Sequence, residues 1–220
     1  MFLDSDHLGK PGSLEQVVQV FIDARFEIDQ LAIRGEHREQ KEYTQEQERT
    51  MTLAYGAEGL SFRAFNPNWQ LQVLQQIDWG VSKLGGEKRA WVRTVTDNTP
   101  CFWQVKYDPA SYSRFLLDIG KSLYKIVSPS FGWVDFDYGL QTTYKDIESL
   151  ELPTLYWANF FGPPYVARIG RAKIMSAPAW DIQELPDGGI LYVLASGPGL
   201  ADDHVPPDDV KSHFGITQVR

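Results

Sequence analysis

The order of the elements is clearest around residues 154–170, which read TLYWANFFGPPYVARIG. The aromatic and apolar run over 155–161 predicts a buried strand. Pro163 and Pro164 suit the first turn of a short helix, because the N–H that proline lacks has no helical partner there. Gly170 suits the end of that helix, since glycine readily adopts the positive φ of a C-terminal cap.

A β-hairpin and a terminal helix are predicted beyond this block. Segments 179–185 and 190–196 flank Pro186-Asp-Gly-Gly189, a turn sequence typical of hairpins. Pro206 and Pro207, followed by two aspartates, start a short helix that ends near Gly215.

Two helices are predicted in the N-terminal part from apolar spacing. Ser13 and Gln16 fit a capping box, and apolar residues at helical spacing then predict a helix over 14–33, ended by Gly35. A second helix begins at Asn66 and Pro67 and ends at Gly85-Gly86. Its apolar stripe contains Leu71, Leu74, Ile77, Val81 and Leu84.

Strands and one further helix fill the middle of the chain. The charged stretch 36–49 is either a connection or an exposed edge strand around Tyr43. Strands are predicted at 51–55, 60–65, 90–96, 102–107 and 131–138. Asp108 and Pro109 cap a helix over about 110–126.

This order, β-β-α-β-β-α-β, predicts an α+β fold with a mostly antiparallel sheet and helices packed on one face. We expect a single domain over 1–220. It would contain an N-terminal helix and charged connection (1–49), a core of β-β-α units (50–139) and C-terminal strands, hairpin and helix (140–220).

The charge pattern favours a protein partner. The net charge is −8, and residues 131–220 carry 12 acidic but only 6 basic side chains. Binding to nucleic acid needs clustered Lys and Arg, so we expect no direct nucleic-acid contact. A basic protein would be attracted to this half of the chain, although acidity also serves solubility alone.

Other classes of function find little support in the sequence. Cys101 is the only cysteine, has no histidine near it in sequence, and reads as a buried structural residue. No apolar run approaches 18 residues and the N-terminus lacks a signal-peptide pattern, so we expect a cytoplasmic protein without a membrane span. No motif predicts a cofactor.

The candidate site is the stretch 131–139, which reads FGWVDFDYG. In a strand, Trp133, Asp135 and Asp137 would share one face. The two carboxylates could act as acid and base or as metal ligands, which would make the protein a metal-dependent hydrolase. They could equally form a polar outward face, or an acidic and aromatic patch for binding a protein.

A second acidic stretch contains Asp202 and Asp203. Together with His204 and His213 these could surround a metal ion, but the spacing matches no metal-site template. We therefore expect no metal and place Asp202 and Asp203 with Trp133 among the partner-binding residues.

The block over 155–170, with FGWVD at 131–135 and AWDIQELPDGGIL at 179–191, resembles immunity proteins of bacterial polymorphic-toxin and type VI secretion systems, such as the immunity protein 52 group. The resemblance covers roughly residues 130–196. It implies an α+β cytoplasmic inhibitor that binds a cognate toxin, often a nuclease.

We therefore expect a protein without catalytic activity that neutralises a basic toxin through an acidic, aromatic surface. Two alternatives remain. The chain could be a phage or host binding protein for defence or counter-defence, or a metal-dependent hydrolase using Asp135 and Asp137.

Overall fold

The computed structural model describes residues 2–3, 13–34, 39–42, 59–69, 71–81, 88–96, 108–135, 142–197 and 206–217. Several predicted features lie outside these residues, namely the strands at 51–55 and 102–107, Tyr43, Gly85-Gly86, Cys101, Asp137, Asp202, Asp203 and His204.

The chain divides into two compact units, which we describe separately. The first consists of Met1, Leu3–Ser111 and Lys121–Ser128, and the second of Phe2, Tyr112–Gly120 and Pro129–Arg220. The single domain over 1–220 stays a prediction.

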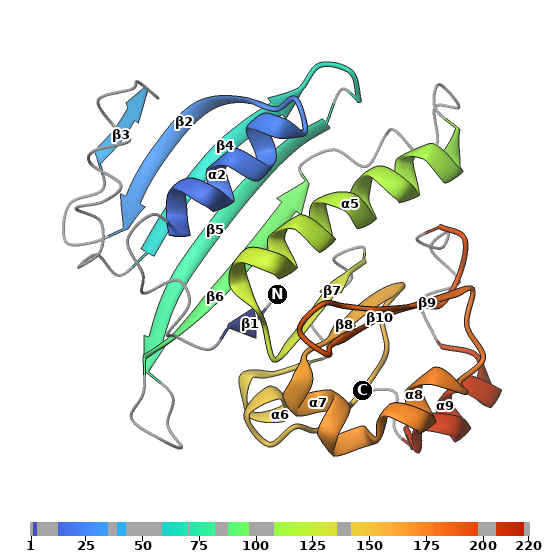
Figure 1. Ribbon diagram of the computed structural model, residues 1–220. Coiled ribbons are helices and arrows are strands. Elements are labelled where there is room, and N and C mark those ends of the chain that lie inside the picture. Colours follow the sequence, from blue (N-terminus) through green and yellow to red (C-terminus); the bar gives the residue numbers. More distant parts are fainter. Residues whose placement is uncertain are drawn as a thin grey trace. The chain divides into compact units, whose positions relative to one another are not determined.

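The first unit holds a helix on an antiparallel sheet (Figure 1). Its elements are α2 (Ser13–Asp23), β2 (Glu27–Arg34), β3 (Glu39–Glu42), β4 (Gly59–Asn66), β5 (Leu71–Val81) and β6 (Lys88–Thr96). Adjacent strands pair antiparallel in the order β3-β2-β4-β5-β6. The buried ring of Phe21 in α2 packs edge-on to Phe62 in β4, with centroids 5.3 Å apart.

The predicted helix over 14–33 is wrong beyond Asp23. Arg25 adopts a φ of 67°, and the Phe26 N–H donates to the Phe21 carbonyl, so the chain turns and enters β2. A β-bulge between Ile28 and Gln30 explains why the spacing of the apolar residues Ile28 and Leu31 resembles that of a helix. The register sets Ile28 opposite Ala64 and Leu31 opposite Phe62, so positions three apart on β2 face positions two apart on β4.

The predicted helix after Asn66 is also wrong, because residues 71–81 form β5, which pairs with β4 on one side and β6 on the other. Its apolar residues also fit a two-residue period, at 71, 73, 77, 79 and 81. The Asn66 side chain does cap backbone, but in a turn: its Oδ1 accepts from the N–H groups of Asn68 and Trp69, each at 3.0 Å. Its Nδ2 donates to the Ala24 carbonyl at 2.7 Å.

Other predictions for the first unit are confirmed. β4 and β6 lie at the strands predicted for 60–65 and 90–96. Of the charged stretch 36–49, residues 39–42 form the strand β3, which stands at one end of the strand order of the described residues. Tyr43, around which the edge strand is predicted, lies outside the described residues.

The second unit has a four-stranded antiparallel order, β7-β8-β10-β9. The short β1 (Phe2–Leu3) also pairs with β7, through Phe2 and Phe131. The strands are β7 (Phe131–Val134), β8 (Ala158–Phe161), β9 (Asp181–Glu184) and β10 (Ile190–Val193). The helices are α6 (Tyr144–Glu148), α7 (Pro163–Ile169), α8 (Arg171–Met175) and α9 (Asp208–Phe214), together with the middle of α5 (Pro109–Val127).

Helices lie on both faces of this second sheet. The Phe161 ring lies 6.3 Å from Tyr165 of α7 and 6.2 Å from Phe214 of α9. On the other face Phe160 lies against Gly120 of α5, where an added Cβ would stand 2.9 Å from the ring. The predicted α+β class with antiparallel strands is confirmed, and in this unit helices occupy two faces.

Local signals place the helix ends and the hairpin of this unit, although β8 begins at Ala158 and not at residue 155 as predicted. The Asp108 carboxylate caps α5 by accepting the Ser111 N–H at 3.0 Å. α7 begins at Pro163 and ends at Gly170, and α9 ends at Gly215, both glycines having positive φ. The predicted hairpin is confirmed as β9 and β10. α8, which follows Gly170 directly, has no counterpart in the sequence prediction.

Candidate functional site

Trp133, the predicted aromatic contact, is held by neighbouring rings of the second unit. Its ring stacks on Tyr156 with centroids 4.7 Å apart and planes 13° from parallel, and it lies 5.6 Å from Phe131. The Tyr156 hydroxyl donates to Thr142 Oγ1 at 2.8 Å, which fixes the supporting ring. Trp133 keeps part of its surface exposed, so it can contact a partner without first becoming ordered.

Asp135 lies outside the strand that the sequence predicts for it. β7 ends at Val134, so the expected alternation of Trp133, Asp135 and Asp137 along one strand face does not extend to Asp135. The carboxylate instead has a structural bond, because its Oδ2 accepts the Trp157 N–H at 3.0 Å. Asp137 lies outside the described part of the chain.

The sequence gives no hint of the part that Asn159 plays in this site. Asn159 is completely buried in β8, and its side chain bonds both backbone groups of Tyr156: Oδ1 accepts from N at 2.9 Å and Nδ2 donates to O at 2.7 Å. Trp157, which follows Tyr156, donates from Nε1 to the Ala195 carbonyl at 2.9 Å. The segment before β8, which carries the ring under Trp133, is therefore anchored by buried polar contacts.

Sequence reasoning also missed Trp180, which stands just before β9. More than half of its surface, 55%, is exposed, and Met175 at the end of α8 exposes 39%. Among the described residues Trp180 is the most exposed large apolar side chain, whereas Met175 is exposed to about the same degree as Ile22 and Phe65. The signal available in the sequence was Pro178-Ala-Trp-Asp181, a tryptophan in a loop directly before an acidic residue.

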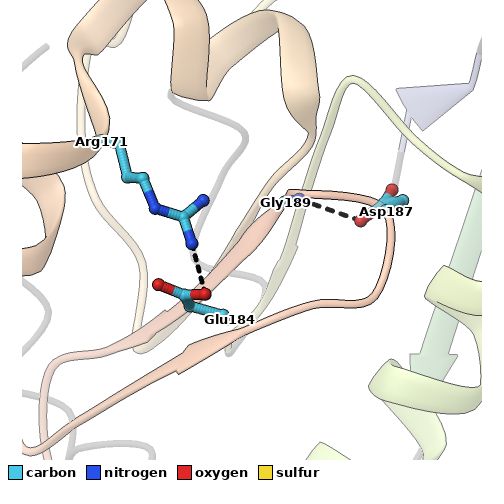
Figure 2. Close-up of polar contacts among 4 residues, drawn as sticks. All are labelled: Arg171, Glu184, Asp187 and Gly189. Atoms are coloured by element: carbon cyan, nitrogen blue, oxygen red, sulfur yellow. Dashed lines mark hydrogen bonds and ion pairs between the residues drawn. The ribbon is translucent and has the colours of Figure 1, made fainter.

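Acidic side chains surround the hairpin and α9. Glu184 at the end of β9 forms an ion pair with Arg171 of α8, and the Asp187 carboxylate accepts the Gly189 N–H at 2.9 Å within the hairpin turn (Figure 2). Asp208 is bonded to Lys211 at 2.5 Å, and this hydrogen bond and the lysine's charge lower the pKa of Asp208. Arg171 and Lys211 are thus each paired with an acidic side chain, while Lys173 Nζ lies 3.5 Å from the Phe214 carbonyl oxygen.

Two buried tyrosines belong to the core of this unit. Burial raises the pKa of Tyr165, and the nearby charges of Asp146 and Glu151 raise it further. Burial also raises the pKa of Tyr192, with an added contribution from Asp209. Both hydroxyls donate to backbone carbonyls, of Glu151 and Pro178 respectively, so their role is structural.

Among the described residues, no three His, Cys, Asp or Glu side chains gather as a metal-ion cluster. No helix of the described segments is long and apolar enough to span a bilayer.

His213 lies with Nε2 2.7 Å from the Lys173 carbonyl, a contact that joins α9 to α8.

Comparison with known proteins finds no matching family model, no matching curated protein and no matching solved structure. The likeness to bacterial immunity proteins therefore rests on the sequence blocks alone.

Proposed function

We propose that this protein is a cytoplasmic inhibitor of the immunity-protein class, without catalytic activity, which binds a basic toxin through acidic and aromatic side chains. The observation that carries the proposal is Trp133, a tryptophan fixed by stacking on Tyr156 and still partly exposed. Because the ring is already ordered, a partner that covers its exposed part loses little entropy in fixing it, which is typical of binding hot spots.

The charge of the chain supports a basic partner. Residues 131–220 hold twice as many acidic as basic side chains, 12 against 6. Opposite charges on two proteins accelerate their encounter and select against partners of the same sign. Asp135, Asp137, Asp202 and Asp203 are the acidic contacts that we assign to this surface.

The proposal is tested first by the neighbouring genes and a co-expression assay. An immunity gene lies beside its toxin gene, so the adjacent product should inhibit growth when expressed alone and not when co-expressed with this protein. If the neighbours instead encode phage or defence components, or if co-expression gives no protection, the immunity assignment is rejected.

Two substitutions then test the binding residues, with the purified toxin domain of that neighbouring gene as the probe. Trp133→Ala should weaken binding by at least tenfold, the loss of about 1.4 kcal/mol. Asp135→Asn keeps an oxygen to accept the Trp157 N–H and removes only the charge, so it should mainly slow association.

Asp23→Asn is the matched control, because Asp23 accepts a hydrogen bond from Gln19 in α2 of the first unit. It should leave binding unchanged. Equal affinity of the Trp133 and Asp135 variants and the wild type would reject these residues as contacts. A large rise in melting temperature with added divalent ions would favour the hydrolase alternative.

A further inference from the structure

α9 covers two aromatic rings of the second unit's sheet. Its Phe214 ring lies 6.2 Å from Phe161 of β8 and 5.4 Å from Tyr192 of β10, and both of these sheet residues are completely buried. Val210, one turn before Phe214, is the other buried side chain of the helix. Movement of α9 away from the sheet would therefore expose aromatic surface.

α9 depends on its contacts with the rest of the unit. It contains seven residues, and helices shorter than about 12 residues are only marginally stable alone in water. The N–H groups of Lys211, Gly215 and Ile216 bond carbonyls of α9 itself or of the residue before it. Among the backbone hydrogen bonds of the described residues, none joins α9 to a strand. Side-chain contacts therefore hold this helix in place.

Two reciprocal contacts tie the C-terminal end of α9 to α8, which lies beside it (Figure 1). His213 Nε2 lies 2.7 Å from the Lys173 carbonyl oxygen, so this nitrogen is the donor. The Lys173 ammonium in turn lies 3.5 Å from the Phe214 carbonyl oxygen. That oxygen belongs to the last turn of α9, where the helix dipole favours a positive charge. Lys173 thus accepts a hydrogen bond through its backbone and supplies a charge through its side chain.

We propose that α9 is a strap over Phe161 and Tyr192, which opens and closes while the sheet stays folded, and that Lys173 and His213 are its latch. This proposal is independent of the proposed function. The sheet resists opening because β10 is paired along its length with β8 on one side and β9 on the other. Elements with few bonds to their surroundings open at a lower free energy than a paired sheet.

Native-state hydrogen exchange, followed by NMR at a series of low urea concentrations, tests the strap. The amides of Lys211, Gly215 and Ile216 report on α9, and those of β10 report on the sheet. In the wild type the α9 amides should be less protected than the β10 amides. Their exchange should also depend less on urea, because opening of α9 exposes less surface than unfolding of the unit. Equal protection and equal urea dependence at the two places would overturn the proposal.

A substitution in the hairpin turn tests independent opening a second time. Gly188 has a φ of 89°, which disfavours alanine, and an added Cβ there would meet nothing within 4 Å. Gly188→Ala should therefore speed exchange in β10 and leave the α9 amides unchanged, since the turn is equally strained whether α9 is open or closed. A parallel rise at α9 would overturn the strap, because α9 would then open only together with the sheet.

The latch is tested by removing its contacts one at a time. His213→Ala should speed exchange of the α9 amides about fivefold, the effect of one lost hydrogen bond. Lys173→Met keeps the carbonyl and removes the charge, so it should also speed exchange, and its difference from the wild type should shrink as salt concentration rises.

Arg171→Gln is the matched control for the latch. Arg171 lies on the same helix as Lys173 but pairs with Glu184 of β9, so its variant should leave α9 exchange as in the wild type. If the His213 and Lys173 variants also leave α9 exchange unchanged, these residues are not the latch.

Discussion

Gly162 offers a sharp test of the packing in the second unit. It lies between β8 and α7, and its N–H donates to the Ser130 carbonyl at 3.0 Å. A Cβ built on Gly162 would stand 2.1 Å from the Pro129 oxygen and 2.9 Å from the Ser130 oxygen. Both contacts are with backbone atoms, so the connection between α5 and β7 would have to move to admit alanine.

The cost of Gly162→Ala follows from these distances. Forcing a methyl group into a packed site costs about 1–3 kcal/mol, and weakening the bond to Ser130 adds about 1 kcal/mol. The lower entropy of the unfolded alanine chain returns about 0.4–1 kcal/mol. We expect the free energy of unfolding, from urea titration followed by circular dichroism, to fall by about 2–3 kcal/mol.

Gly188 in the hairpin turn is the matched control, because its positive φ, and not a lack of space for a side chain, favours glycine there. Its φ is 89° and an added Cβ would meet nothing within 4 Å. Gly188→Asn should therefore cost little, since asparagine tolerates positive φ, whereas Gly162→Asn should be at least as damaging as Gly162→Ala. A loss below about 0.5 kcal/mol for Gly162→Ala would refute the steric argument.

Three further predictions concern buried or capping groups. Asn159→Ala leaves both backbone groups of Tyr156 without their partners and should lower the free energy of unfolding by about 2–5 kcal/mol, measured by urea titration. Asp108→Ala removes the cap of α5 and should cost about 0.5–2 kcal/mol in the same assay. Tyr165 and Tyr192 have raised pKa values in the folded state, so the unfolded chain ionises first. The free energy of unfolding that the raised pKa values contribute is fully present below about pH 10. It is lost as pH rises through the folded pKa, by up to about 1.4 kcal/mol per pH unit for each tyrosine. Tyr165→Phe should reduce that alkaline slope, and an unchanged slope would contradict the assignment.

Elements with local signals could be predicted from the sequence. Asp108 with Pro109 marks the start of α5, and the turn before β10 marks the hairpin, because capping and turn chemistry act over a few residues. β5 could not be predicted in this way. Its apolar residues fit both a helical and a strand period, and only its pairing with β4 and β6 decides between them.

The candidate site was predictable in residue type but not in geometry. The sequence pointed to Trp133 and Asp135, but Tyr156 and Trp157, which bind them, lie more than 20 positions along the chain. Trp180 was missed because a tryptophan is usually buried, and although Pro178 and Asp181 indicate a loop, they do not fix how much of the ring is exposed. Contacts distant in sequence therefore decide which aromatic residue is available to a partner.

The Asn66 side chain links two corners of the first unit, since it bonds the turn after β4 and also the Ala24 carbonyl, 42 residues away. The amide protons of Asn68 and Trp69 lie in a turn after β4 and are hydrogen-bonded to Asn66 Oδ1. The same side chain is held by its bond to the Ala24 carbonyl, in the turn between α2 and β2. Their exchange with deuterium should therefore accompany the opening of that distant corner. The exchange rates of the Asn68 and Trp69 amides would then report whether the turn after α2 is in its folded position.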